Sequence, residues 1–115
     1  MKRLLSVFLI LIFLISCNRD GAPVGVIAEE KMISLLTDIH LIDGYILNVL
    51  QDTIKPSAAG LHESVFKKHK TDSIQFRKSM QFYSQNPDKL RLMYEKVTAN
   101  LDTLRNEFLR EKLTK

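Results

Sequence analysis

Cysteine is nearly missing from this chain, and tryptophan is missing altogether. Its 115 residues include one cysteine, three prolines and four glycines. A single thiol cannot close a disulfide within the chain, and it cannot supply the several thiolates of a structural zinc site. We therefore expect a domain held together by its apolar core alone, without a disulfide, a metal ion or another cofactor.

A strong charge of one sign and the common catalytic motifs are also missing. The chain has 17 basic and 13 acidic residues, a formal net charge of +4. This small excess does not indicate binding to the phosphate backbone of nucleic acids, and we expect no nucleic-acid partner. No nucleophile elbow, phosphate-binding loop or paired-carboxylate motif is present, so we expect the protein not to be an enzyme.

The longest apolar run lies at the N-terminus. Residues 4–15 are apolar apart from Ser6, and they follow Lys2 and Arg3. A membrane-spanning helix needs about twenty apolar residues, so this run is too short to span a bilayer. A short apolar run behind basic residues is typical of a signal peptide. Cleavage after residue 16 would also remove Lys2 and Arg3 and lower the net charge of +4 by two.

The run ends in Leu14-Ile15-Ser16-Cys17, and Cys17 is the sole cysteine. An aliphatic pair, a small residue and a cysteine resemble the lipobox of bacterial lipoproteins, in which the cysteine is acylated and becomes the first mature residue. The alternative is an ordinary signal peptide or a membrane anchor with an incidental cysteine. We expect a signal peptide over residues 1–16 and an exported protein, held by acyl chains on Cys17 to the cell envelope at the outer membrane. Its periplasmic or surface exposure is left open.

The rest of the chain is divided into a tether over residues 17–27 and a helical domain over residues 28–115. Apolar residues recur at three and four positions, the period of an α-helix, and strand alternation fails. Helices are predicted over residues 28–51, 61–70, 72–84 and 87–111, and the second could begin earlier, at Ser57. Asn86 is a good N-cap and Pro87 suits the first helical position. These features predict an all-α protein, an antiparallel bundle of three to four helices.

A few polar residues fall on apolar faces. Asp43 lies within the apolar arc of the first domain helix, where a carboxylate needs a partner. Tyr83 and Tyr94 lie on the inward stripes of the last two helices, and Ser79 lies inward beside Tyr83. We expect a structural hydrogen bond from Asp43 to a tyrosine hydroxyl, and the alternative is a polar contact inside a small pocket.

Apolar residues also fall on outer faces. Leu41 and Tyr45 lie outward on the first domain helix, and Leu92 and Leu109 lie outward on the last, so these four are the candidate interaction surface. The inward stripe of the last helix is predicted to continue through Leu104 and Phe108. His62 and His69 are two turns apart, about 10 Å, which is too far for one metal ion.

Several stretches resemble a known family. Met32 to Asp43 reads Met-x-x-Leu-Leu-x-Asp-Ile-His-Leu-x-Asp, and Val65 to His69 reads Val-Phe-Lys-Lys-His. Further on come Phe76, Ser79, Tyr83 and Asn86-Pro87. Together with the lipobox, this order of features resembles a family of small uncharacterised lipoproteins of Bacteroidota, classed as a domain of unknown function. The resemblance implies a lipid-anchored helical domain and brings no activity, cofactor or catalytic residue.

Two functions fit these features. The first is a non-enzymatic, lipid-anchored module that binds another envelope protein, as an interaction or assembly accessory. The alternative is a helical bundle that binds a small ligand or a lipid, with a polar pocket at Asp43. An exposed apolar patch over a closed core would favour the first, and an enclosed cavity beside Asp43 would favour the second.

Overall fold

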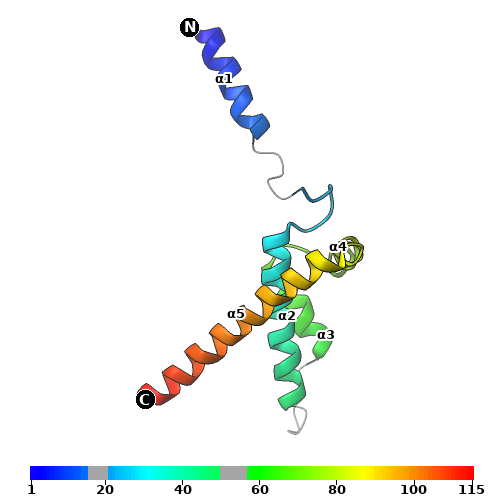
Figure 1. Cartoon of the computed structure of the whole chain (residues 1–115), viewed down its shortest axis with the longest axis vertical. Coiled ribbons are helices and arrows are strands. Elements are labelled where there is room, and N and C mark those ends of the chain that lie inside the picture. Colours follow the sequence, from blue (N-terminus) through cyan, green and yellow to red (C-terminus); the bar gives the residue numbers. More distant parts are fainter. Residues whose placement is uncertain (16–20, 50–56) are drawn as a thin grey trace.

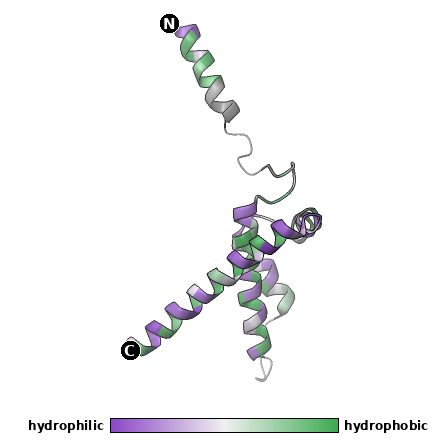
Figure 2. Cartoon of the chain, viewed as in Figure 1, coloured by the Kyte–Doolittle hydropathy of each residue, from purple (hydrophilic) through white to green (hydrophobic). Residues whose placement is uncertain are grey.

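The protein is all-helical in the computed structural model, which describes residues 1–15, 21–49 and 57–115, without the side chains of residues 11–15 and 49. Its elements are α1 (Lys2–Ile15), α2 (Glu29–Val49), α3 (Ala58–Lys68), α4 (Ser73–Ser84) and α5 (Pro87–Thr114). No residue of these described ranges is in a strand, so the all-α prediction is confirmed. Figure 1 shows α1 standing apart from the other four helices, and Figure 2 shows its described part as predominantly hydrophobic. Cys17 lies outside the described residues.

Side-chain caps begin three of the helices. The Asn86 side chain accepts a hydrogen bond from the Lys89 amide at 3.1 Å, and Pro87 opens α5, as predicted. The Asp72 side chain accepts from the Gln75 amide at 2.8 Å and begins α4. Ser57 caps α3, so the earlier of the two predicted starts is the observed one. Each cap satisfies a backbone amide that has no partner within its helix, which contributes about 1 kcal/mol.

The connection from α3 to α4 is a tight reversal. Lys70 has a left-handed backbone with φ of 53°. Its amide donates to the Lys67 carbonyl at 3.0 Å, and the Thr71 amide donates to the Phe66 carbonyl at 2.9 Å. This pair of bonds is the Schellman arrangement, which ends a helix and satisfies its last carbonyls. It turns the chain directly into α4.

The core lies where α2 meets α3 and α5, and where α4 meets α5. Its buried side chains come from all four helices and from the segment before α2. The largest contributions come from Met32, Leu35 and Leu36 of α2, Val65 and Phe66 of α3, Tyr83 of α4, and Met93 and Val97 of α5. Each large apolar side chain stabilises the fold by about 1.5–3 kcal/mol when it is fully buried.

The segment Ala22–Ile27, which we call the strap, packs on the domain. Ala22 and Ile27 are both buried. Between them the Val26 amide donates to the Pro23 carbonyl at 3.1 Å, and Gly25 supplies the positive φ of 83° at the third turn position. A type II turn requires such a φ there, which glycine adopts without strain. The predicted tether over residues 17–27 is therefore docked from Ala22 onward, and its residues 17–20 lie outside the described part.

The longest helix runs past the core. Figure 1 shows α5 crossing α2 obliquely, after which the two helices diverge. This arrangement is less regular than an antiparallel bundle with α2 and α5 along a common axis. Met93 and Val97 are buried at the crossing, whereas Leu104 and Phe108 of the predicted inward stripe are exposed. Those two positions were wrongly predicted to pack, because α5 has 28 residues and extends beyond its neighbours. No helix of the described residues is long and apolar enough to cross a membrane.

Candidate functional site

Two carboxylates of α2 face two imidazoles, one in α3 and one at the residue that caps its C-terminal end. Asp43 Oδ1 and His62 Nε2 share a hydrogen bond of 2.7 Å, and Asp38 Oδ2 and His69 Nε2 share another of 2.7 Å. Lys68 Nζ donates to the same Asp38 oxygen at 2.8 Å. The two Asp–His pairs join the helices at separate levels. They form two polar rungs between α2 and α3.

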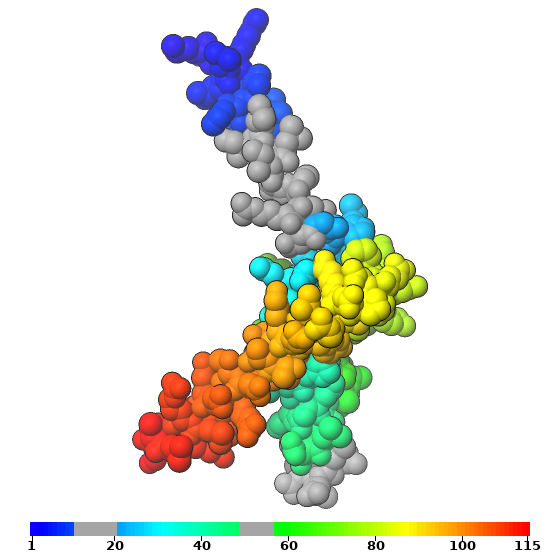
Figure 3. All heavy atoms as spheres, viewed as in Figure 1, coloured from blue at the N-terminus to red at the C-terminus, as the bar shows by residue number. Residues whose placement is uncertain are grey.

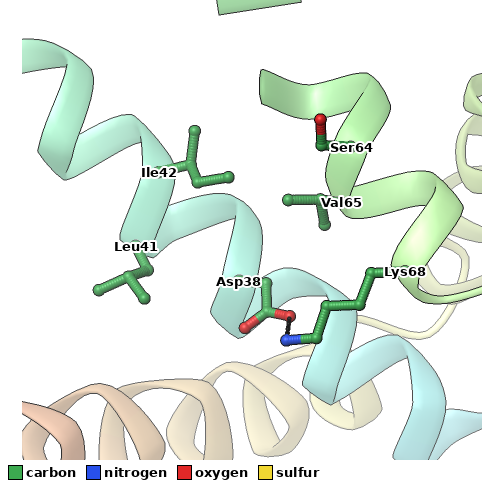
Figure 4. A pocket seen from close by; sticks show the side chains of 6 residues that line it. All are labelled: Asp38, Leu41, Ile42, Ser64, Val65 and Lys68. Atoms are coloured by element: carbon green, nitrogen blue, oxygen red, sulfur yellow. Dashed lines mark hydrogen bonds and ion pairs between the residues drawn. The ribbon is translucent and has the colours of Figure 1, made fainter. Parts of the chain in front are cut away.

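An open groove lies between the rungs. It has a volume of about 280 Å³ and is lined by Asp38, Leu41, Ile42, Ser64, Val65 and Lys68. Figure 4 shows the Asp38–Lys68 ion pair at one end of this groove and the aliphatic side chains along the helices beside it. Each rung brings one carboxylate to one imidazole, and the described residues hold no group of three His, Cys, Asp or Glu side chains suited to a metal ion. The arrangement is that of two packed helices joined by polar side-chain contacts, the two Asp–His pairs.

Asp43 is the predicted polar residue whose surroundings differ most from expectation. Its side chain is 44% exposed, and its hydrogen-bond partner is His62. The predicted hydrogen bond from Asp43 to a tyrosine is therefore wrong. Asp43 lies at the edge of the apolar face, where α3 covers it only in part, so its carboxylate stays in contact with solvent.

The predicted inward residues of α4 hold the strap. The Tyr83 hydroxyl donates to the Ile27 carbonyl at 2.6 Å, and the Ile27 amide donates to Ser79 Oγ at 2.8 Å. Tyr83 is 1% exposed, and Ser79 is fully buried. Tyr94 of α5 is only half-buried and packs edge-on against His40 of α2, with ring centroids 5.8 Å apart. The structure therefore brings Ser79 and Tyr83 together and leaves Asp43 and Tyr94 elsewhere.

The four predicted surface residues are all exposed, but they lie on different parts of the molecule. Leu41 and Tyr45 belong to the C-terminal part of α2, residues 41–49, which we call the α2 arm. Leu109 belongs to residues 101–114 of α5, the α5 arm, and Leu92 lies before the crossing. Leu92 and Leu109 are 17 residues apart on one helix, about 25 Å, so they do not share one patch.

The two arms diverge and leave a wedge between them, which Figure 3 shows as an open angle in the molecular surface. The base of this wedge has a volume of about 330 Å³ and is lined by Ser34, Thr37, Asp38, Asn100, Thr103, Leu104 and Glu107. At this base Asn100 Nδ2 donates to Thr37 Oγ1 at 3.3 Å, which ties α2 to α5. Farther out, the arms carry exposed Leu41, Tyr45, Leu47, Phe108, Leu109 and Leu113. The wedge is polar at its base and apolar along its arms.

Asp38 has a carboxyl group whose pKa is shifted by its surroundings. Partial burial raises the pKa of its carboxyl, but the hydrogen bonds from Lys68 and His69 and the positive charge of Lys68 outweigh that effect. The pKa of Asp38 is therefore below its ordinary value of 3.8. Folding favours the carboxylate form, so the rung is an acid-sensitive contact.

Acid should weaken the contacts of Asp38 with Lys68 and His69. The folded-state pKa of Asp38 is lowered, so its contribution to stability is present at neutral pH and is lost as the pH falls below 3.8 through the folded-state pKa. We expect Asp38→Asn to lower the melting temperature at pH 7 and to flatten its decline between pH 5 and pH 3. Thermal melts by circular dichroism measure both effects. The control is Asp102→Asn, which removes one carboxylate from the exposed face of α5. If this variant flattens the decline of the melting temperature equally, the acid sensitivity does not come from Asp38.

The polar rungs were missed from the sequence, although a signal for them exists. Asp38 and Asp43 are five residues apart, while His62 and His69 are seven apart on the next helix. In an antiparallel helix pair the first aspartate lies opposite the second histidine and the second aspartate opposite the first histidine. The observed pairs Asp38–His69 and Asp43–His62 follow this order. The buried Thr37, whose hydroxyl donates to the Ile33 carbonyl at 2.8 Å, was also missed. A hydroxyl that bonds its own helix leaves no periodic signature.

The comparisons with known proteins identify a family and no relative of known activity. No curated protein and no solved structure matches the chain. One protein-family profile matches residues 23–107, a range that begins inside the strap and ends within the α5 arm. It therefore covers the strap from Pro23 onward, both polar rungs and the base of the wedge. Because this match covers more than half of the 115 residues, the chain belongs to the family described as domain of unknown function DUF4296.

Proposed function

We propose that this protein is a non-enzymatic lipoprotein of the cell envelope, anchored to the outer membrane by acyl chains on Cys17. The support is the N-terminal order of basic residues, a short apolar run and Leu14-Ile15-Ser16-Cys17. One acyl chain gives only marginal membrane binding, whereas two or more anchor a protein stably. In this proposal residues 1–16 are removed as a signal peptide, and the helical domain serves at the membrane surface as an interaction or assembly module.

The observation that carries the proposed interaction is the pair of apolar arms. Phe108 is 56% exposed, and Leu104 and Leu109 beside it are also exposed. Leu104 and Phe108 continue the stripe of α5 that is buried at Met93 and Val97, whereas Leu109 lies on the outer side of the same helix. A stripe that is covered in one half and open in the other is typical of a helix whose second partner is another protein.

The shape of the wedge indicates what such a partner presents. The α5 arm has a length of about 20 Å, at 1.5 Å per residue. The α2 arm carries exposed Leu41 and Tyr45. An amphipathic helix of a partner protein, laid between the arms, would cover both apolar faces and complete a helical bundle. Polar groups at the base, such as Thr103 and Asn100, would then set its depth.

The binding of a small ligand is less well supported. That function needs an enclosed apolar cavity with a few convergent polar groups. Asp43 is instead half exposed and engaged by His62, and the neighbouring groove between α2 and α3 is open to solvent. The geometry favours the protein partner.

Site-specific photocrosslinking in intact cells tests the proposed interaction. We expect a photoreactive residue at Phe108 or Leu104 to give one discrete adduct with another envelope protein. The matched position is Asn106, which lies between them in sequence and faces away on the helix. The substitution Leu104→Glu should weaken the adduct at Phe108 severalfold while changing the melting temperature little, since Leu104 is already exposed. Equal labelling at Asn106 and Phe108, or no adduct at either arm, would contradict the proposal.

A further inference from the structure

The strap fixes where the domain is joined to its N-terminal segment. Both main-chain groups of Ile27 are bonded to α4, the carbonyl by Tyr83 and the amide by Ser79. The Ile27 and Ala22 side chains at the two ends of the strap are buried. The two buried hydrogen bonds at Ile27, together with burial at both ends, keep the strap on the folded domain.

The length of chain before the strap limits how far the domain can move. This step rests on the proposed lipidation of Cys17. From Cys17 to Ala22 the chain has five residues, which span at most about 18 Å in any conformation. Ala22, the first residue of the strap, therefore stays within that distance of the lipidated residue, which keeps the strap and the helix α4 that it packs on close to the lipid headgroups. Figure 1 shows the α5 arm extending away from the strap, toward the opposite side of the core.

The side chains exposed on that surface suit an anionic bilayer. Val24 of the strap is 93% exposed and Ile74 of α4 is 71% exposed. Lys78 lies one turn after Ile74 and reaches over the strap at Gly25. Arg77 is three residues after Ile74, which makes it a surface neighbour on the helix. We call Val24, Ile74, Arg77 and Lys78 the strap face.

Acidic groups are few around the strap face. Residues 21–27 and 73–84 contain no Asp or Glu. Of the nearest acidic residues that the structure describes, Asp72 is engaged as the cap of α4, and Glu29 pairs with Lys89 at 3.2 Å. Asp88 lies in the first turn of α5, beyond the far end of α4. Neither Arg77 nor Lys78 forms an ion pair with a described residue, so both cations are available to a ligand.

We propose that the strap face is a membrane-docking surface, which rests on the anionic headgroups of the bilayer that holds the acyl chains. Basic side chains near such a surface are attracted to it, and exposed apolar side chains enter the headgroup region. The occupant is a lipid surface because the short chain before Ala22 keeps this face beside the bilayer. Docking would orient the domain with its α5 arm directed away from the membrane, where a protein partner can reach it.

Fluorescence quenching in vesicles tests the docking. The variant Gln81→Cys is expressed and purified from membranes as the lipidated mature protein; residue 81 lies beside Lys78 in the hollow that α4 forms with the strap. A second preparation carries the cysteine at Thr103, at the base of the wedge. Both are labelled with a fluorophore and placed in vesicles of phosphatidylcholine with about one third phosphatidylglycerol and a headgroup-attached nitroxide quencher. We expect quenching at residue 81 to exceed quenching at residue 103 severalfold, and to fall in phosphatidylcholine alone.

Charge reversal supplies the control. The double variant Arg77→Glu/Lys78→Glu should lower quenching at residue 81, because each cation near an anionic surface changes the bound-to-unbound ratio about fivefold. Arg105→Glu/Arg110→Glu makes the same charge change on the α5 arm and should leave quenching unchanged. Equal quenching at residues 81 and 103 in chains that float with the vesicles overturns the docking surface alone. Chains that do not float with the vesicles overturn the anchoring, and the docking surface with it.

Discussion

Replacing Tyr83 by phenylalanine should lower the free energy of unfolding by about 1–3 kcal/mol, the cost of leaving a buried polar group without its hydrogen bond. The hydroxyl of Tyr83 donates to the Ile27 carbonyl at 2.6 Å in surroundings that leave Tyr83 1% exposed. Phenylalanine keeps the ring and its apolar contacts, so the loss reports mainly on this bond. For a domain of this size each kcal/mol lowers the melting temperature by about 4–8 °C.

A control tyrosine and a double-mutant cycle test whether the loss of stability comes from the hydrogen bond between Tyr83 and Ile27. Tyr94→Phe removes a hydroxyl from a half-buried ring that packs against His40, and it should change stability by less than about 0.5 kcal/mol. Ser79→Ala removes the other bond to Ile27, and since both bonds hold one residue, the two losses should not add. Urea titrations give the free energies of unfolding of the wild type, Tyr83→Phe, Ser79→Ala and the double variant, which complete the cycle. The same titration is applied to Tyr94→Phe. A Tyr83→Phe protein as stable as the wild type would show that the strap is not fastened by this hydroxyl.

Local signals predicted most of the helices. Asn86 and Pro87 begin α5 as expected, because capping and the fixed φ of proline act within one turn of the chain. The apolar period predicted the buried faces of α2 and α5 where a neighbour covers them. At Leu104 and Phe108 the same period continues without a neighbour, and a pattern cannot state whether its partner lies in the same chain.

The polar contacts were harder to predict because they depend on which helices meet. Asp43 has the right angular position for burial, but its exposure is set by how far α3 covers α2. Tyr83 and Ser79 were placed inward correctly, yet their partner is the main chain of Ile27, more than fifty residues earlier. A hydrogen bond to the backbone of an irregular segment has no counterpart in side-chain periodicity.

Replacing Cys17 by serine should abolish acylation completely, since serine lacks the sulfur that carries the lipid. Each buried methylene contributes about 0.8 kcal/mol to membrane binding, so the loss of two or more acyl chains removes the dominant anchoring term. We expect the wild-type protein to incorporate labelled palmitate and to enter the detergent phase in a phase-separation assay. The Cys17→Ser protein should incorporate none and should keep residues 1–16, which gives it a larger apparent mass.

The retained apolar run makes the control for this prediction essential. In the Cys17→Ser precursor, residues 4–15 could still hold some protein at the membrane, but a run of this length is shorter than the about twenty residues of a stable span. An alkaline carbonate wash should therefore release this variant and leave the wild type bound. Ser16→Ala keeps a small residue before the cysteine and should behave as the wild type. Incorporation of palmitate into Cys17→Ser, or its absence from the wild type, would refute the lipid anchor. The five-residue connection from Cys17 to Ala22 would then no longer place the strap face at the membrane.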